Sequence, residues 1–342
     1  ICSGLVGSEM CIRDRHTDSG AGQLRWHGIA LTRWSPDPTV EDAGLWIYLR
    51  DEETGELWSA GQNPTGTHPA ESRLLYYPHR IEHLRRERGI ASRMEVCIAG
   101  SDDVELRRIS LTNESMRPRR LSVTSYAEVA LLPLSDLGRH PAFEKLFVVS
   151  ERIAESALFF QRRARSPKDP RVVLLHQVIA KDPRARLSRV ETDRERFLGR
   201  HGTIRQPQAL QLAEGTEGSA MDGDAVAGLD PIFSLQVELD LLPGAEITLD
   251  FLTIASESKQ GALRLARRYR TSSAVGGAVA EAERGSFNEL ADLGVDPSAL
   301  PDLQRLLSGL LFGAPSLRPP PRELAQYSGS QDRLWGCLLY TS

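Results

Sequence analysis

The residues best suited to contact a sugar are two Arg-Trp pairs in the run GAGQLRWHGIALTRW, namely Arg25-Trp26 and Arg33-Trp34. An indole offers a flat apolar face and a guanidinium offers several hydrogen-bond donors, a combination that suits a hydroxyl-rich ring. The same residues also suit a β-sandwich, with the tryptophans in its core and the arginines along an edge. Of the two interpretations, the pattern favours the structural one.

Adjacent acids occur at Asp51-Glu52-Glu53 and at Asp102-Asp103. Glycoside hydrolysis commonly uses two carboxyl groups on opposite sides of the scissile bond. The first group precedes Thr-Gly, which is typical of an exposed turn, so we expect these carboxylates to stay solvated and not to act as proton donors. The second group is interpreted in the same way. No residue of the chain is predicted to be catalytic.

Candidate metal ligands and nucleophiles are sparse. His79 and His83 are four residues apart, but no carboxylate motif accompanies them, so a zinc site is not expected. The segment MDGDAVAG lacks the ligand spacing of a calcium loop. Cys97 lies on the strand face opposite Met94 and Val96, where a structural thiol is expected. Without a glycine-rich phosphate loop either, the chain is predicted to bind no metal or cofactor.

The formal net charge of −4 argues against a nucleic-acid partner. Arginine pairs lie among acids or at element edges, without the one-sided excess that a phosphate backbone requires; they are Arg85-Arg86, Arg119-Arg120, Arg162-Arg163 and Arg267-Arg268. No stretch approaches the roughly 18 consecutive apolar residues of a membrane span. The apolar fraction of 40% suffices for a sizeable core, so we expect a globular chain.

The elements that would hold these residues are mostly strands. From about residue 24 to residue 255 apolar and polar residues alternate, and turn residues separate the runs, which is typical of an all-β domain. Residues 105–113 and 121–131 are predicted to be antiparallel neighbours, and residues 235–241 and 247–254 to form a hairpin at Pro243-Gly244. The uniformly apolar RVVLLHQVIA indicates a strand covered on both faces.

After Ser256 the apolar period becomes helical. One helix is predicted from the stripe Val275, Val279, Ala282, Ser286, Leu290 and Leu293. Asp296-Pro297 then offers an N-cap and a first-turn proline for a second helix. The run PSLRPPPRE indicates a stiff connector at a domain boundary.

Four blocks carry a resemblance to a known family: WIYLRDEETGELWSAGQNPTG, HPAFEKLFVVSE, ETDRERFLGRHG and GLDPIFSLQVELDLLPG. Together they closely resemble the cyclic β-1,2-glucan synthase branch of glycoside hydrolase family 94, the cellobiose-phosphorylase-like enzymes. The resemblance implies a mainly β fold, with a large antiparallel β-supersandwich of the galactose-mutarotase-like kind over residues 16–256. Linker α-helices would follow over residues 257–320, and the truncated start of an (α/α)6 barrel over residues 321–335.

The resemblance also implies where chemistry would occur. In this family a carboxylic acid protonates the leaving oxygen while inorganic phosphate attacks from the other face, and these groups belong mostly to the barrel. The chain would therefore be a non-catalytic scaffold that meets β-glucan oligosaccharide and inorganic phosphate through the barrel of its parent. Direct substrate contacts would be limited to Arg25, Trp26, Arg33 and Trp34, and to Gln331 and Trp335 of the barrel-like segment GSQDRLWG.

Further expectations concern the ends and the setting of the chain. Residues 1–15 and 336–342 have no family counterpart and look like translated sequencing adapter, so we expect them to be non-native and to lie outside the fold. The resemblance implies homodimer contacts, a position on the cytoplasmic side and an inner-membrane parent.

Two alternatives stay open. The chain could be a free-standing carbohydrate-binding sandwich that recognises glucans through Trp26, Trp34 or Trp58. It could also be the corresponding domain of another disaccharide phosphorylase, because the sandwich is shared across the family.

Overall fold

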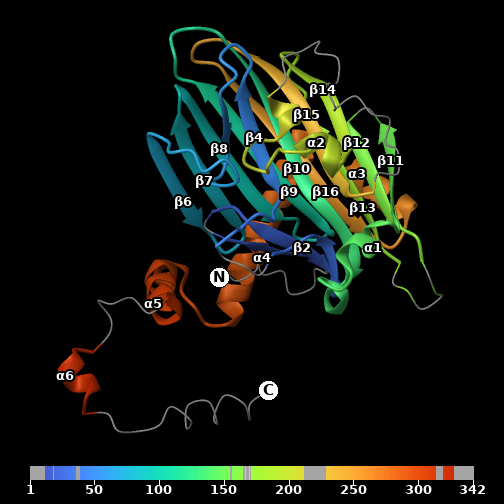
Figure 1. Cartoon of the computed structure of the whole chain (residues 1–342). Helices are drawn as coiled ribbons and strands as arrows, with labels where there is room; N and C mark the ends of the chain where they lie inside the picture. Colours follow the sequence, from blue (N-terminus) through green and yellow to red (C-terminus); the bar gives the residue numbers. More distant parts are fainter. Residues whose placement is uncertain are drawn as a thin grey trace. The chain divides into compact units, whose positions relative to one another are not determined.

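A computed structural model describes residues 12–17, 19–35, 39–154, 156–164, 166, 169, 171–211, 229–312 and 319–326. The chain divides into two compact units, residues 1–286 and residues 287–342. The first unit contains two antiparallel sheets packed face to face (Figure 1), each of eight strands among the described residues. The predicted mainly β sandwich is confirmed.

The first sheet is organised around one long strand. Its order is β1-β2-β3-β10-β15-β14, and β4 and β5 extend it beside β10. Strand β10 pairs with β15 along one side and with β4 and then β3 along the other, with a bulge where Leu131 takes a φ of 51°. The strand bounds are β1 (Ile12–His16), β2 (Gly22–Trp26), β3 (Ile29–Thr32), β4 (Trp46–Asp51), β5 (Leu57–Ser59), β10 (Arg119–Pro133), β14 (Ala185–Asp193) and β15 (Pro231–Leu241).

The second sheet has the order β11-β12-β13-β16-β9-β8-β7-β6. Strand β13 corresponds to the uniformly apolar run and is buried at every residue, which confirms the prediction that both its faces are covered. The strand bounds are β6 (Glu71–Tyr76), β7 (Arg80–Glu87), β8 (Ile90–Ile98), β9 (Val104–Asn113), β11 (Val148–Ala154), β12 (Ala157–Arg162), β13 (Val173–Ile179) and β16 (Glu246–Ser256).

The two strand pairings predicted across short loops are wrong. Strands β9 and β10 belong to different sheets, and so do β15 and β16. Each loop is therefore a corner that carries the chain from one sheet to the other. The buried Asn113 joins the two corners: its Nδ2 donates to the backbone oxygens of Leu241 (3.0 Å) and Arg117 (2.8 Å). The alternation predicted the strands, but an alternating strand buries one face equally well in either arrangement.

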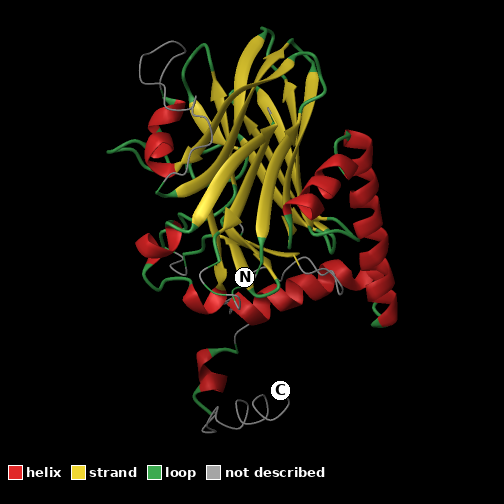
Figure 2. Ribbon diagram, turned by 90° about the vertical axis from the view of Figure 1, so that its right-hand side faces the viewer, coloured by secondary structure: helices red, strands yellow, loops and turns green. Residues whose placement is uncertain are grey.

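The main core fills the space between the sheets. Apolar side chains from the inner faces of both sheets meet there, and full burial of one such side chain contributes roughly 1.5–3 kcal/mol. Its large members include Leu49, Trp58, Phe160, Phe233, Leu235 and Phe251. A second apolar cluster lies on the outer face of the second sheet, under helices α3 (Lys259–Arg268) and α4 (Ser272–Asp292) (Figure 2). It contains Val275 of the predicted helical stripe, with Val279 partly buried against it, whereas Leu293 of that stripe is exposed.

Shorter helices complete both units. The first unit contains η1 (Leu134–Asp136), α1 (Pro141–Lys145), α2 (Arg194–Leu198) and η2 (Gln208–Leu210). The second unit contains η3 (Pro297–Ala299), α5 (Leu300–Phe312) and α6 (Pro321–Leu324). The predicted cap is present, because the Asp296 side chain accepts from the Ser298 N–H and Pro297 opens the turn. Within the described ranges no helix combines the length and apolar character needed to cross a membrane.

The expectation that residues 1–15 lie outside the fold is wrong for residues 12–15. Ile12–His16 forms β1 and pairs with β2, and the side chains of Ile12, Asp14 and His16 are buried. The edge of a sheet offers unpaired backbone groups, and an extended segment of any composition can pair with them. Family resemblance therefore does not predict such a strand. Residues 1–11 and 336–342 are outside the described residues.

Candidate functional site at one end of the sandwich

A network of charged side chains lies at one end of the first sheet, around Glu128 of β10. Arg194 at the start of α2 donates from Nε to Glu128 Oε1 at 2.6 Å, and Arg33, just after β3, places Nε 3.5 Å from Glu128 Oε2. The Arg33 backbone N–H also donates to the Glu128 backbone oxygen at 3.0 Å. One carboxylate thus connects two segments that are far apart in sequence.

Asp230, directly before β15, extends this network. Its carboxylate forms an ion pair with Lys145 of α1 and lies 3.9 Å from Arg194 Nη1. We call the five side chains Arg33, Glu128, Lys145, Arg194 and Asp230 the junction network. Three of the family-like blocks and the Arg-Trp run supply four of its members, so segments that resemble the family at separate places in the sequence meet at one place in the fold.

Local sequence explains the position of α2. The Asp193 side chain caps the helix by accepting from the N–H groups of Glu195 and Arg196. Phe197 is fully buried and stacks on Tyr126, with ring centroids 4.7 Å apart. Gly199 has a φ of 80°, and a side chain there would overlap Gln208 of η2. The block ETDRERFLGRHG therefore forms a compact cover on the outer face of the first sheet.

The electrostatics of the junction network favour permanent charges. Burial opposes the charge of Arg194, but the nearby Glu128 outweighs it and raises the pKa of the guanidinium. Burial and Glu128 also raise the pKa of the Tyr126 phenol well above its ordinary value, so this hydroxyl stays neutral. No group with a shifted pKa here is brought near neutrality, where general acid or base catalysis needs it. The arrangement can hold segments together or receive a partner.

The predicted sugar-contacting residues lie in different surroundings. Trp26 is 5% exposed, packs in the core and donates from Nε1 to Asp103 Oδ2 at 2.8 Å. Trp58 is 1% exposed in the same core, so the alternative in which either indole binds glucan is wrong. Trp34 is half-buried beside Arg33, and Arg25 donates to Gln23 Oε1 at 2.6 Å. The predicted Gln331 and Trp335 lie outside the described residues.

Asp51 and Asp102 are structural anchors, which corrects the expectation that they stay solvated, whereas Glu53 is exposed as expected. Asp51 is fully buried and accepts from the N–H of Glu53 at 2.8 Å and from Nε of Arg119 at 2.9 Å. Burial alone would raise the pKa of Asp51, but these donors outweigh it and lower the pKa. Asp102 accepts from the Tyr269 hydroxyl at 2.5 Å. We assign these acids no proton-donor role, because donors within the fold hold Asp51 and Asp102.

Cys97 and His83 lie in buried surroundings. Cys97 is buried, and burial raises the pKa of its thiol to about 12, which keeps it protonated. His83 lies 2.8 Å from His16 between their Nε2 atoms, and burial lowers the pKa of His83 to about 3. Among the described residues no three His, Cys, Asp or Glu side chains gather as metal ligands. The segment MDGDAVAG, which we did not expect to bind calcium, lies outside the described residues.

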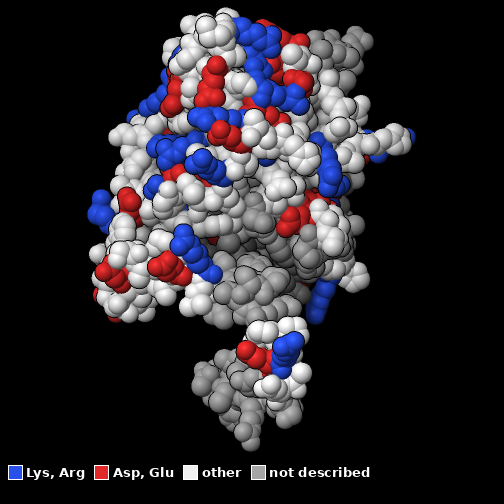
Figure 3. All heavy atoms as spheres, turned by 90° about the vertical axis from the view of Figure 1, so that its left-hand side faces the viewer, with Lys and Arg blue, Asp and Glu red and all other residues white. Residues whose placement is uncertain are grey.

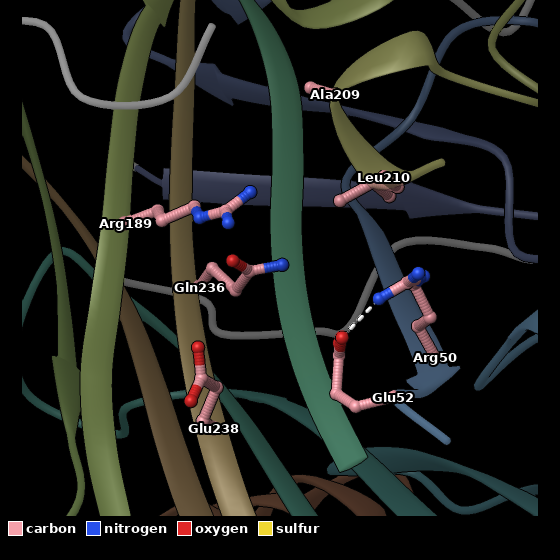
Figure 4. Close-up of a pocket in the computed structure, with 7 residues that line it drawn as sticks. All are labelled: Arg50, Glu52, Arg189, Ala209, Leu210, Gln236 and Glu238. Atoms are coloured by element: carbon pink, nitrogen blue, oxygen red, sulfur yellow. Dashed lines mark hydrogen bonds and ion pairs between the residues drawn. The ribbon is translucent and has the colours of Figure 1, made fainter. Parts of the chain in front are cut away.

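A second polar feature lies on the outer face of the first sheet (Figure 4). Arg50 of β4 faces Arg189 of β14 and Gln236 of β15 across β10, and Leu210 of η2 borders the space. We call this space the polar hollow; it has a volume of about 10 Å³, which is room for about one water molecule. A sugar ring does not fit there in this arrangement.

Both carboxylates of the polar hollow are engaged by arginines. Glu52 forms an ion pair with Arg50. Glu238 accepts from Arg120 Nη2 at 2.9 Å and from Arg186 Nη2 at 2.6 Å. Burial would raise the pKa of Glu238, but these two donors outweigh it and lower the pKa, so this carboxyl is ionised at neutral pH. Both carboxylates of the hollow are thus held by cationic partners.

On another face of the sandwich, shown in Figure 3, basic and acidic side chains intermingle and do not separate into patches of one sign. Arg93, for example, donates from Nη2 to Glu82 and Glu95 at 2.9 and 3.0 Å. This pattern is typical of a solvated face with paired charges.

Comparison with known proteins places this fold in a family. The family described as "Glycosyl hydrolase 94, supersandwich domain" matches residues 16–272, which is more than half of the chain. The chain belongs to this family. This glycosyl hydrolase 94 member is 30% identical over 320 residues to the cyclic beta-(1,2)-glucan synthase NdvB of Rhizobium meliloti (strain 1021), which covers 93% of this chain and 11% of the relative. The predicted resemblance is confirmed.

A further curated relative is a phosphorylase. Solabiose phosphorylase of Paenibacillus borealis is 27% identical over 228 residues, which are 65% of this chain and 27% of the relative. The chain thus spans about a tenth of the synthase and about a quarter of the phosphorylase. Among solved structures, a bacterial glucoamylase complexed with acarbose aligns with a TM-score of 0.43 and 7% identity, over 81% of this chain and 36% of that one.

Sequence reasoning named Arg33 but missed Glu128, Lys145, Arg194 and Asp230 as members of one network. A signal for Glu128 was present, because it is the only acid in the otherwise apolar and hydroxyl-bearing run LSVTSYAEVAL. The capping residue before Arg194 was a second signal, since it fixes where α2 begins. Their convergence depends on strand order in the first sheet, which the sequence alone does not provide.

Proposed function

We propose that the chain is the supersandwich and helical linker of a cyclic β-1,2-glucan synthase, and that it scaffolds a catalytic barrel without performing chemistry itself. The observation that carries this proposal is the 30% identity to the synthase NdvB over 93% of the chain. The carboxylates of the junction network and the polar hollow support it, since each is held in an ion pair with an arginine or a lysine.

The junction network is the part of the scaffold that we propose to meet the barrel. Four of its five members come from segments that resemble the family, and it holds the half-buried Trp34 at the same end through Arg33. In the whole protein, β-1,2-glucan and inorganic phosphate would bind in the barrel. The homodimer and the cytoplasmic-side location that the resemblance implies are part of the same proposal, and light scattering of the purified chain tests the dimer.

A phosphorolysis assay tests the scaffold proposal. The purified chain, incubated with β-1,2-glucan and inorganic phosphate, should release no glucose 1-phosphate above a blank without protein. A complete phosphorylase of the family, assayed with its own substrate, shows that the detection works. Release that grows with the concentration of the chain and disappears in Glu128→Gln would overturn the proposal.

Trp34 favours a second candidate function, a glucan-binding sandwich, because it is the one of the three proposed tryptophans that keeps part of its surface in solvent. Calorimetry with β-1,2-gluco-oligosaccharides separates the two functions. A binding module gives saturable heat that Trp34→Ala removes and that Trp34→Phe largely keeps, since an aromatic face remains for stacking. A scaffold gives no saturable heat with any of these proteins.

A further inference from the structure

We infer that the polar hollow on the outer face of the first sheet is a binding site for a monoatomic inorganic anion, a halide such as chloride. Two guanidinium groups line it from opposite sides, Arg50 from β4 and Arg189 from β14, and Gln236 of β15 presents its amide between them (Figure 4). These groups carry N–H donors, which an anion can accept from several directions at once.

Two arginines, Arg50 and Arg189, and two glutamates, Glu52 and Glu238, line the hollow, and both glutamates are engaged by arginines. Glu52 is paired with Arg50, and Glu238 is shared by Arg120 and Arg186. Arg189 is half-buried and makes no hydrogen bond or ion pair within the part of the chain that the structure describes. A bound anion would compensate this charge, whereas a water molecule would not.

Arg50 adds an unused donor at the same place. Its side chain is about nine-tenths buried, and its Nε has no hydrogen-bond partner among the described residues. A buried donor without a partner costs about 1–3 kcal/mol, so a ligand that accepts from it gains that much in its favour. The Gln236 amide has partners of its own: its Nε2 lies 3.2 Å from Thr124 Oγ1 and 3.4 Å from Ser122 Oγ, and its Oε1 accepts from the Ser188 hydroxyl at 3.2 Å. An anion would share its N–H groups with these partners.

The backbone of β14 is arranged to bring Arg189 to this face. The pairing of β14 with β15 shifts between Leu187 and Arg189, so that one extra residue, Ser188, lies in the strand. Without this bulge Arg189 would share the inward face of Leu187; with it, Arg189 lies opposite Gln236 on the outer face. An unpaired arginine is therefore directed to the hollow by a specific irregularity of the strand.

Size selects among anions. The hollow holds about 10 Å³, close to the space of one water molecule, and chloride and bromide, although larger than water, are smaller than the tetrahedral oxyanions. A tetrahedral oxyanion such as phosphate or sulfate needs several times this space. The site is therefore expected to prefer chloride and bromide, and it is independent of the catalytic role proposed for the barrel.

Thermal unfolding of the purified chain tests the inference. The midpoint is measured at constant ionic strength while sodium gluconate is replaced by sodium chloride, bromide, phosphate or sulfate. Chloride at ten times its Kd should raise Tm by about 3 °C with a saturable dose dependence, and bromide should do the same. Arg189→Gln should abolish the difference between chloride and gluconate. Arg264→Gln removes the same charge from an exposed position on α3 and should keep that difference.

Two results of the thermal unfolding experiment would overturn the inference. Equal chloride responses in the unsubstituted chain and in Arg189→Gln overturn the inference, and so does a Tm that rises with phosphate or sulfate but not with chloride. Crystals soaked in sodium bromide give a second readout that does not depend on any variant. An anomalous peak between Arg50 and Arg189 supports the site, whereas bromide peaks only elsewhere on the surface refute it.

Discussion

Replacing Asn113 by alanine should destabilise the whole sandwich, because this side chain joins the two corners at which the chain changes sheets. Its Nδ2 donates to the backbone oxygens of Leu241 and Arg117, and its Oδ1 accepts from the Ser115 N–H at 3.0 Å. Asn113 Oδ1 also accepts from the Ser115 hydroxyl, so alanine removes four hydrogen bonds. At about 1 kcal/mol for each, the free energy of unfolding should fall by about 4 kcal/mol.

Urea unfolding measures this loss. With a slope of about 3 kcal/mol per molar urea, the midpoint should fall by about 1.3 M while the slope stays unchanged. Ser115→Ala is the matched control, because it removes the hydroxyl's bonds to Asn113 Oδ1 (2.6 Å) and to the Arg117 backbone oxygen (3.2 Å) but keeps both Asn113 donations, so it should cost less than about 2 kcal/mol. If Asn113→Ala costs no more than Ser115→Ala, the two corners are not coupled through Asn113 and the reasoning fails.

Three more predictions concern buried groups. Burial lowers the pKa of His176 to about 3, below the ordinary value near 6.5, so the unfolded chain binds the proton first as the pH falls. Stability should therefore decline below pH 6.5 by about 1.4 kcal/mol per pH unit for this group, and the urea midpoint of His176→Gln should fall less steeply between pH 6.5 and 5. In a variant whose other three cysteines are serine, Cys97 should react with a thiol reagent only in urea, and fast reaction without urea would contradict its burial. Gly202→Ala should cost more than about 2 kcal/mol because its Cβ would overlap the Leu198 carbonyl oxygen, whereas Gly285→Ala, with open space around it, should be neutral or stabilising.

The sequence predicts the elements of the sandwich better than their partners. Alternation in β15 and β16 identifies both strands, and the apolar run of β13 identifies a strand covered on both faces. The same alternation is compatible with a hairpin or with a corner, because each buries one face of each strand. The loop at Pro243-Gly244 did not decide between them, and the deciding contact, from Asn113, comes from a distant part of the chain.

The chemistry of single residues was harder to predict where a partner lies far away in sequence. Trp26 was correctly favoured as a core residue, but its hydrogen bond to Asp103 could not be foreseen. Asp51 looked solvated because its neighbours in sequence are acids and Thr-Gly, while the group that neutralises it, Arg119, comes from β10. The junction network depends on strand order in the same way, since Arg194 meets Glu128 only once the first sheet has formed.

The crossing of the chain between sheets has a consequence for how the protein is made. Strand β10 pairs with β15, and β9 pairs with β16, across more than a hundred residues of sequence in each case. Such high contact order makes folding slow, because a long loop must close before these contacts form. A nascent chain cannot complete the first sheet until β15 has left the ribosome, or the second sheet until β16 has done so. Until then the growing chain exposes unpaired apolar strands, so its yield in a cell depends on protection during synthesis.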